Sequence, residues 1–278
     1  MKIKFLGTGA AEGVPAEFCN CEYCQNIRKI GESEFRTRSQ VVIDGILSVD
    51  FPPDAYMHFL KYGTGTADIE YLLVTHSHMD HFYAHDFILR GYKYASLQTG
   101  NLAVYGNAEV GKVFCECTAR EMKPEVAQYI NFTQIKPYTV FNAGEYRVIA
   151  IPAVHSKEED CLLYYIERDG KGYLHLYDTG NVTDEAIEFL KVNGAKAGVV
   201  AFDCTFAERN GGLISRHMGI CDNMQIKQKL IEAGVAGNDT KYLITHFSHN
   251  ANPLRENLKA LEEQYGVIAA YDGLEIEI

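Results

Sequence analysis

The sequence contains no run of about 18 apolar residues, the length that a membrane-spanning helix requires. Its first residues, MKIKFLG, include neither a long apolar run nor a small-residue cleavage site, so we expect no signal peptide. No repeat, low-complexity tract or linker rich in proline, glycine and serine marks a domain boundary. We therefore expect a single domain over residues 1–278, located in the cytoplasm and without a membrane partner.

Positive charge is also scarce in this chain. Lys and Arg number 26 against 37 Asp and Glu, which gives a formal net charge of -11. Such a surface repels a long nucleic acid, so we do not expect a nucleic-acid partner, whereas a small anionic substrate remains compatible. The eight cysteines should stay unpaired in a reducing compartment, which leaves their thiolates free to bind metal.

Short β-rich runs alternate with helical patterns, an arrangement typical of layered α/β domains. The β-rich runs are residues 2–6, 40–50, 71–75, 102–105, 146–151, 162–167, 173–177, 198–202 and 242–245. Caps and periodicity predict three helices: one from Thr183 to near Gly194, one opened by Asp222 that ends before Gly234, and one opened by Asn252 and Pro253. Several runs are followed at once by His or Asp, so a sheet edge can bring these side chains to one point.

The segment 76–81, HSHMDH, concentrates potential metal ligands directly after an apolar strand. They are three imidazoles and one carboxylate: His76, His78, Asp80 and His81. Imidazoles and carboxylates bind Zn, Mn and Fe, and four of them at a bend between strand and loop can serve two metal ions. A polar loop with incidental histidines is the alternative interpretation.

Three cysteines lie within six positions near the start of the chain: Cys19, Cys21 and Cys24. They are too close together to form relaxed disulfides with one another, but they can surround one tetrahedral zinc if a fourth ligand comes from elsewhere. We predict that His249 is this ligand and that the structural zinc ties the N-terminal loop to the far end of the chain. Three ordinary loop cysteines are the alternative.

The HxHxDH segment resembles the signature of the metallo-β-lactamase superfamily. That family has a His, an Asp and another His further along, each after a strand, and this chain matches them with His155, Asp178 and His246. The resemblance implies an αβ/βα sandwich of two mixed sheets flanked by helices. It also implies two divalent ions, one held by His76, His78 and His155 and the other by Asp80, His81 and His246, with Asp178 bridging them.

Further motifs are similar to the PhnP branch of this superfamily, which includes phosphoribosyl cyclic phosphate phosphodiesterases. They are the opening FLGTGAAEGVP at 5–15, the CxCxxC motif, the RTRS run at 36–39 and THFSH at 245–249. In that branch the three cysteines and the second His of THxSH bind a structural zinc. The resemblance also implies a homodimer, because relatives often pair.

The chemistry expected of this centre is phosphodiester hydrolysis. Two dications roughly 3.5 to 4 Å apart lower the pKa of a shared water, and the bridging hydroxide is then the nucleophile. Asp80 is expected to act both as a metal ligand and as a catalytic residue. The leaving oxygen needs a proton, so we predict His217 as general acid, oriented by Asp203. A purely structural role for His217 is the alternative.

The expected function is therefore a metal-dependent phosphodiesterase acting on a small or cyclic phosphodiester, with Zn, Mn or Fe in the active site. A tRNase Z-like 3′-processing endoribonuclease is one alternative, although no basic arm or Lys/Arg cluster for tRNA is visible. A non-catalytic metal- or cofactor-handling protein on the same fold is another, and thioester or β-lactam hydrolysis are lesser options. Arg36 and Arg38 are candidates either for substrate phosphate contact or for a structural role.

Overall fold

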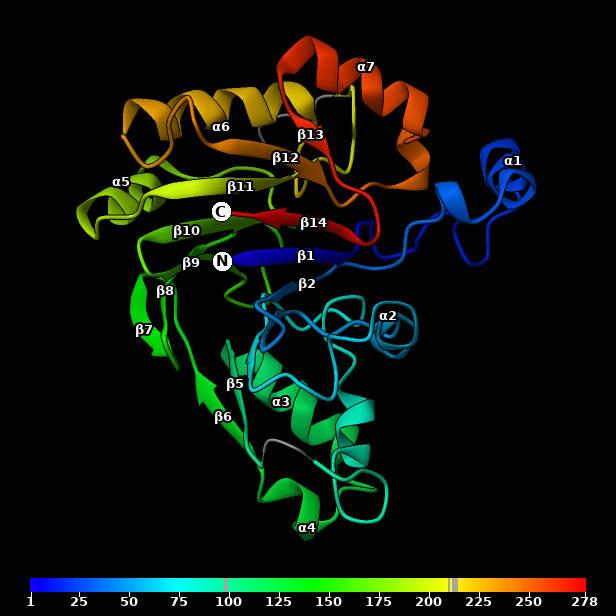
Figure 1. Cartoon of the computed structure of the whole chain (residues 1–278), viewed down its shortest axis with the longest axis vertical. Coiled ribbons are helices and arrows are strands. Elements are labelled where there is room, and N and C mark those ends of the chain that lie inside the picture. Colours follow the sequence, from blue (N-terminus) through cyan, green and yellow to red (C-terminus); the bar gives the residue numbers. More distant parts are fainter. Residues whose placement is uncertain (98–99, 210, 212–214) are drawn as a thin grey trace.

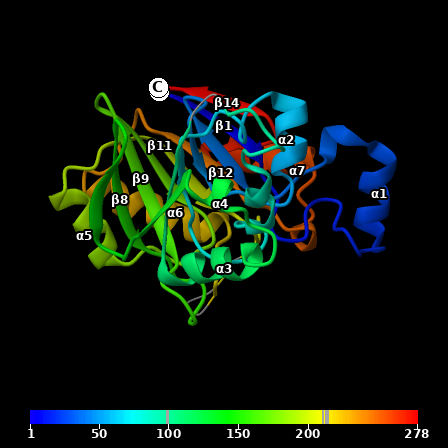
Figure 2. The same cartoon turned by 90° about the horizontal axis from the view of Figure 1, so that it is seen from below.

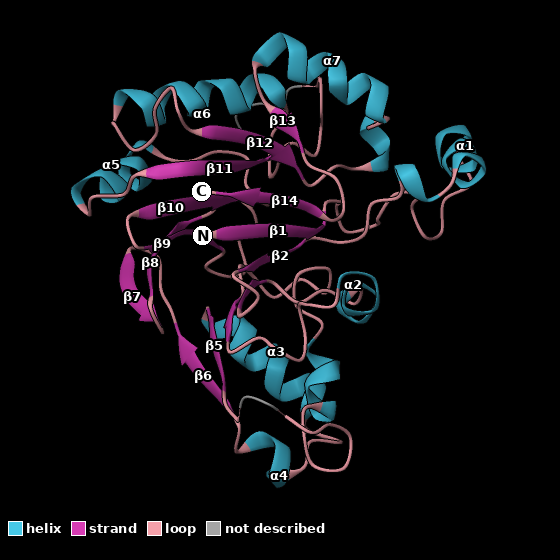
Figure 3. Cartoon of the chain, viewed as in Figure 1, coloured by secondary structure: helices cyan, strands magenta, loops and turns pink. Residues whose placement is uncertain are grey.

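Two mixed β-sheets form the centre of the protein in a computed structural model that describes residues 1–97, 100–209, 211 and 215–278 (Figures 1 and 3). The first sheet has the strand order β14 (Leu274–Glu277), β1 (Lys2–Gly7), β2 (Gln40–Ile43), β3 (Leu47–Val49), β4 (Tyr71–Leu73), β5 (Leu102–Gly106) and β6 (Ile130–Gln134). The second has the order β13 (Ile268–Ala269), β12 (Lys241–Thr245), β11 (Ala197–Asp203), β10 (Lys171–Leu176), β9 (Leu162–Arg168), β8 (Tyr146–Pro152) and β7 (Thr139–Ala143).

Strand directions in the second sheet place several chain segments at one edge. Strands β10, β11, β12 and β13 pair in parallel, whereas β7, β8, β9 and β10 pair antiparallel. Strand β8 therefore runs in the same direction as β10, β11 and β12. The loops that follow these four strands leave the sheet at the same edge, which is where polar side chains can gather.

The described residues form seven helices and three 3-10 turns. They are α1 (Glu22–Ile30), α2 (Ala55–Tyr62), α3 (Ala108–Thr118), α4 (Pro124–Ala127), α5 (Asp184–Val192), α6 (Ile220–Glu232) and α7 (Arg255–Tyr265), with 3-10 turns η1 (Glu32–Glu34), η2 (Ala84–Leu89) and η3 (His249–Ala251). Helices α5, α6 and α7 pack on the second sheet, and α3 and η2 pack on the first. Helix α1 stands apart from both sheets in both views (Figures 1 and 2).

Side chains that alternate along a strand contribute to two different apolar layers of the fold. In β11, Val199 and Ala201 belong to the apolar cluster between the two sheets, while Val200 and Phe202 belong to the cluster under the helices. Successive side chains of a strand point to opposite faces, so a strand covered on both faces is apolar throughout. The predicted sandwich of two mixed sheets flanked by helices is confirmed.

Eight of the nine predicted strands are present, with ends that differ by at most two residues. The prediction of one strand over 40–50 is wrong, because β2 and β3 are the two arms of a hairpin. Asp44 and Gly45 both have positive φ, 50° and 79°. Asp and Gly adopt this left-handed conformation more readily than most residues, and together with Ile46 they form the three-residue loop between Ile43 and Leu47, which pair in the hairpin.

The starts of two predicted helices also shift. Helix α6 begins at Ile220, and Asp222 lies in its first turn, where its carboxylate accepts a hydrogen bond of 2.9 Å from the backbone N–H of Gly219. Helix α7 begins at Arg255 because Asn252 has a φ of 52° and ends the preceding 3-10 turn. Thr183 caps α5 as predicted, with its side chain accepting from the backbone N–H of Ala186. Within the described ranges, no helix combines the length and apolarity needed to cross a membrane.

Candidate metal centre

The predicted ligands all follow strands. The segment 76–81 follows β4 of the first sheet, and the other ligands follow three strands of the second sheet: His155 after β8, Asp178 after β10 and His246 after β12. Because the loops of the second sheet leave at one edge, side chains separated by more than a hundred positions meet there. The structure brings all seven predicted ligands together in two groups.

The first group consists of three histidines. The Nε2 atom of His76 lies 2.9 Å from Nδ1 of His78, and Nε2 of His155 lies 3.2 Å from that same atom. Three imidazole nitrogens that face one point form the donor set of a divalent transition-metal site. His76 is buried and His78 is exposed, so this group opens toward solvent on one side.

The second group is buried and contains two carboxylates. The Nε2 atom of His81 lies 3.2 Å from Oδ2 of Asp80, and Nε2 of His246 lies 3.3 Å from Oδ2 of Asp178. The same Asp178 oxygen contacts His81 Nε2 and lies 3.8 Å from Nε2 of His76, which belongs to the first group. Asp178 therefore lies between the groups, as a bridging ligand would.

Three buried polar atoms test whether metal ions fit here. None of the described residues offers a hydrogen bond to Nε2 of His81, Nε2 of His246 or Oδ2 of Asp178, although these atoms converge. Leaving buried polar atoms without a partner costs about 1–3 kcal/mol each. A bound cation would satisfy all three, so the donor set fits a metal centre.

The charges of this group favour cation binding. Burial raises the pKa of Asp178, but His246 and His81 lower it more strongly, so the pKa lies well below its ordinary value. Burial lowers the pKa of His81, but Asp178, Asp80 and Asp50 raise it well above its ordinary value. Bound metal ions would take the place of protons on these histidines and neutralise the carboxylates.

Asp203 and His217 form a pair beside the second group. The Nδ1 atom of His217 lies 2.8 Å from Oδ2 of Asp203 and 3.2 Å from Oδ1 of Asp178. Burial lowers the pKa of His217, but Asp203 and then Asp178 outweigh it and raise the pKa to about 9. Asp178, Asp203, His217 and His246 also lie close enough together to form a further candidate metal group.

Sequence reasoning missed several residues that support this centre. Asp50, at the end of β3, accepts a hydrogen bond of 2.7 Å from Nδ1 of His81. Glu159 accepts from the backbone N–H and the hydroxyl of Ser77, at 3.0 and 2.8 Å, and holds the 76–81 loop from the side of β8. The signal for Asp50 was its position as a carboxylate directly after an apolar strand. No comparable signal marked Glu159, which lies among other acidic residues.

Both arginines of the RTRS run have structural contacts. Arg36 is buried, donates to Thr8 Oγ1 at 2.9 Å, and lies over the ring of Phe247 at 4.6 Å. Arg38 forms ion pairs with Glu17 at 2.9 Å and Asp54 at 3.3 Å. These contacts favour the structural interpretation for both residues.

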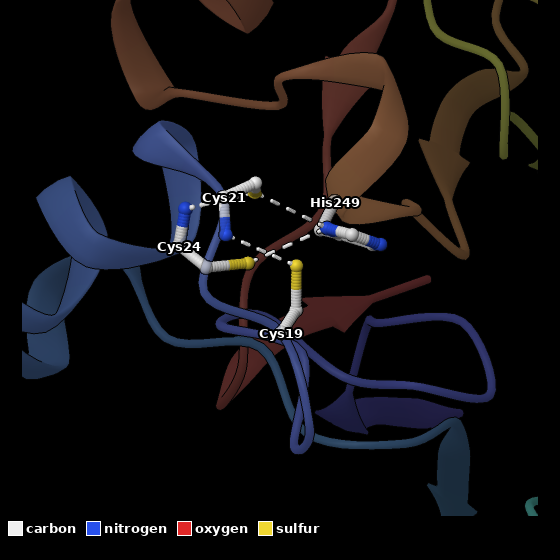
Figure 4. A group of neighbouring side chains, drawn as sticks. All are labelled: Cys19, Cys21, Cys24 and His249. Carbon is white, nitrogen blue, oxygen red and sulfur yellow. Dashed lines mark hydrogen bonds between the residues drawn. The ribbon is translucent and has the colours of Figure 1, made fainter.

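The three cysteines and His249 also meet (Figure 4). The Sγ atom of Cys24 lies 3.4 Å from Nδ1 of His249, and Sγ of Cys21 lies 3.9 Å from it. Cys21 caps helix α1, and the backbone N–H of Cys24 donates to its sulfur at 3.4 Å. That hydrogen bond, followed by contacts with His249 and Cys19, lowers the pKa of Cys21 to about 6. A thiolate stable near neutral pH suits a zinc ligand.

Comparison with known proteins places this geometry in a family. Residues 41–247 match the family model of the β-lactamase superfamily domain. Ribonuclease Z of Oenococcus oeni is 28% identical over 185 residues, which cover 63% of this chain and 51% of that protein. Octanoyltransferase of Porphyromonas gingivalis is 26% identical over 286 residues, which cover 99% of this chain and 51% of that protein. The chain thus spans about half the length of the curated relatives it matches.

A solved structure shares the fold over the whole chain. A diphosphatase of the PhnP family superposes with a TM-score of 0.72 at 19% identity, covering 100% of this chain and 97% of that chain. The matching family model covers most of the chain and includes all seven ligands of the two groups. The chain therefore belongs to the metallo-β-lactamase superfamily.

Proposed function

We propose that the protein is a metal-dependent phosphodiesterase that acts on a small or cyclic phosphodiester. The observation that carries the proposal is the position of His217, whose Nδ1 atom is held by Asp203 at 2.8 Å and lies 3.2 Å from Asp178. An oriented imidazole next to a two-metal centre is the combination that hydrolysis with a poor leaving group requires. The motifs similar to the PhnP branch support the same substrate class.

The metal ligands divide between two ions. His76, His78 and His155 would hold one, and Asp80, His81 and His246 the other, with Asp178 shared. Zn, Mn and Fe all suit these donors, and when bound such ions supply an activated water and bind phosphoryl oxygens.

The protein's own residues then manage the proton and the orientation. His217 donates a proton from Nε2 to the leaving oxygen, and Asp203 accepts the hydrogen bond from Nδ1 and keeps the ring in place. His155 donates from Nδ1 to the backbone oxygen of Arg216 at 3.3 Å, which fixes one ligand to the loop that carries His217. Substrate that binds at the exposed side of the first group thus lies between a metal ligand and the proton donor.

Activity assays test this proposal directly. Protein loaded with manganese or zinc should hydrolyse bis(p-nitrophenyl) phosphate and a ribose cyclic phosphate, and Asp80→Ala should abolish both activities while the circular dichroism spectrum stays unchanged. The absence of turnover with both substrates would overturn the proposal. An octanoyl thioester belongs in the same panel, because 99% of the chain matches half of a protein named octanoyltransferase.

A second candidate is a tRNase Z-like endoribonuclease, which the 28% identity to Ribonuclease Z favours. The net charge of -11 opposes it, because binding a polynucleotide depends on basic side chains that neutralise its phosphates. Cleavage of a precursor tRNA in preference to the small phosphodiesters, together with a gel shift by that tRNA, would establish this function instead.

A further inference from the structure

One carboxylate in the second sheet contacts two different imidazoles, one of them through a hydroxyl. Asp203 Oδ2 lies 2.8 Å from Nδ1 of His217. The other oxygen, Oδ1, accepts from the hydroxyl of Thr205 at 2.8 Å and from its backbone N–H at 2.9 Å. The Thr205 hydroxyl in turn lies 2.8 Å from Nδ1 of His246. Asp203 and Thr205 are both buried.

The first sheet repeats this arrangement with different residues. Asp50 Oδ2 lies 2.7 Å from Nδ1 of His81. Its Oδ1 accepts from the hydroxyl of Thr75 at 3.0 Å and from the backbone N–H of Thr75 at 2.8 Å. The Thr75 hydroxyl lies 3.0 Å from Nδ1 of His76. Asp50 and Thr75 are both buried, as in the other pair.

The direction of these hydrogen bonds follows from proton counting. A threonine hydroxyl has one proton. The Thr205 hydroxyl has two acceptors within reach, Asp203 Oδ1 at 2.8 Å and the backbone oxygen of His246 at 2.9 Å. An ionised carboxylate is the stronger acceptor, so the proton points to the aspartate in both pairs. The hydroxyl oxygen must then accept a hydrogen bond, and the histidine has to carry its proton on Nδ1. The lone pair on Nε2 is thereby directed at the metal position in both His76 and His246.

We propose that Thr75 and Thr205 are positioning residues, each of which fixes the tautomer of one metal-binding histidine and transmits the charge of an aspartate to it. This inference rests on the two-metal centre of the proposed function, although it does not depend on the substrate. Since His76 and His246 belong to different groups, each threonine should control a different metal ion.

Nuclear magnetic resonance of histidine-labelled, zinc-loaded protein tests the tautomers. Long-range proton-nitrogen spectra should show His76 and His246 protonated on Nδ1. Thr205→Val keeps the shape of the side chain but removes the hydroxyl, so it should change the His246 signals and leave those of His76 unchanged. Thr75→Val is the matched control and should do the reverse.

Zinc titration against a competing chelator supplies a second readout. Each valine variant should lower the affinity for one of the two active-site zinc ions by roughly 10- to 100-fold. This is the usual effect of losing a residue that orients a metal ligand. Thr205→Ser and Thr75→Ser keep the hydroxyl and should restore most of that affinity, which separates loss of the hydrogen bond from a general packing defect.

Three results would overturn the inference. The first is that both valine variants keep the wild-type tautomers and zinc affinities. The second is that each valine variant loses affinity for both zinc ions equally. The third is that the serine variants lose as much affinity as the valine variants. Neither readout uses a substrate. The absence of phosphodiesterase activity would therefore contradict the proposed function without affecting the outcome of these two measurements.

Discussion

Asp203 and His217 lie side by side, and their separation of 2.8 Å permits a prediction about leaving groups. His217→Ala should lower the rate on a ribose cyclic phosphate by about 10²- to 10⁴-fold, because the alkoxide that leaves must be protonated. The loss on bis(p-nitrophenyl) phosphate should be much smaller, since p-nitrophenolate leaves without a proton. Steady-state rates at equal metal content measure both, and equal losses on the two substrates would show that His217 supports the metal centre instead.

A buried histidine outside the centre makes stability depend on pH. His58 lies 2.7 Å from both Thr37 Oγ1 and Gln40 Oε1, and burial lowers its pKa from 6.5 to about 4, with Lys61 adding to the decrease and Asp54 opposing it. Between pH 6.5 and about pH 4, His58 binds a proton more readily in the unfolded state than in the folded state. The free energy of unfolding therefore falls as the pH decreases below 6.5.

The matching variant is His58→Gln, which cannot titrate in this range. Urea denaturation at pH 7 and pH 5 should show that the wild type loses about 2 kcal/mol more than the variant over this interval. Parallel losses in the two proteins would mean that His58 is protonated in the folded state.

The seven ligands could be predicted from the sequence because four of them share the HxHxDH segment and the other three match the later His, Asp and His of the superfamily, each after a strand. Asp50, Thr75 and Thr205 could not be predicted in the same way. Asp50 follows an apolar strand, but its position alone does not reveal its role, and all three roles depend on partners from other strands: Asp50 with His81 and Thr75, and Thr205 with His246. Pairings of this kind arise from the sheet arrangement, which spacing along the chain does not encode.

At the scale of elements, we expect helix α1 to depend on a metal held by the cysteine and histidine group more than on packing. Only Cys24 and Ile27 of this helix are buried, and the helix stands apart from the sheets (Figure 1). A small element of this kind gains stability from a bound metal that joins it to the rest of the chain.

Cys21→Ser should therefore remove one zinc per chain and make residues 16–35 sensitive to protease, since the metal would no longer tie Cys24 to His249. Elemental analysis and limited proteolysis measure the two effects. Cys115→Ser, which changes an exposed cysteine of α3, is the control and should alter neither. Retention of the full metal content by Cys21→Ser would contradict the structural zinc site.

Elements with clear alternation or caps could be predicted from the sequence, whereas others could not. Strand β6 is exposed along most of its length, and its apolar alternation is limited to Ile130 and Phe132, which is too short to distinguish it from a loop. Strand β13 has two residues, too few for any periodic pattern. Helix α2 lacks a side-chain cap, and its polar and apolar residues do not separate cleanly. In these elements, pairing and packing with distant segments decide the conformation.

At the scale of the molecule, the fold is compatible with both an acidic chain and the anionic substrate that we propose. The net charge of -11 is spread over the whole protein, whereas the histidines and two aspartates of the centre meet at the edge shared by both sheets. Two bound dications would make that edge locally positive, because cations dominate the field close to them. We therefore expect selectivity for a small anion over a polynucleotide, since a small substrate would contact the centre and little of the acidic surface.

Anomalous X-ray scattering from crystals of the manganese- and zinc-loaded protein tests the metal centre most directly. We predict two peaks at the sheet edge, one within reach of His76, His78 and His155 and one within reach of Asp80, His81 and His246, with Asp178 touching both. A third peak, with the absorption edge of zinc, should lie among the cysteines. A map with no peak at the sheet edge, or one in which these seven side chains point away from a common centre, would contradict the account.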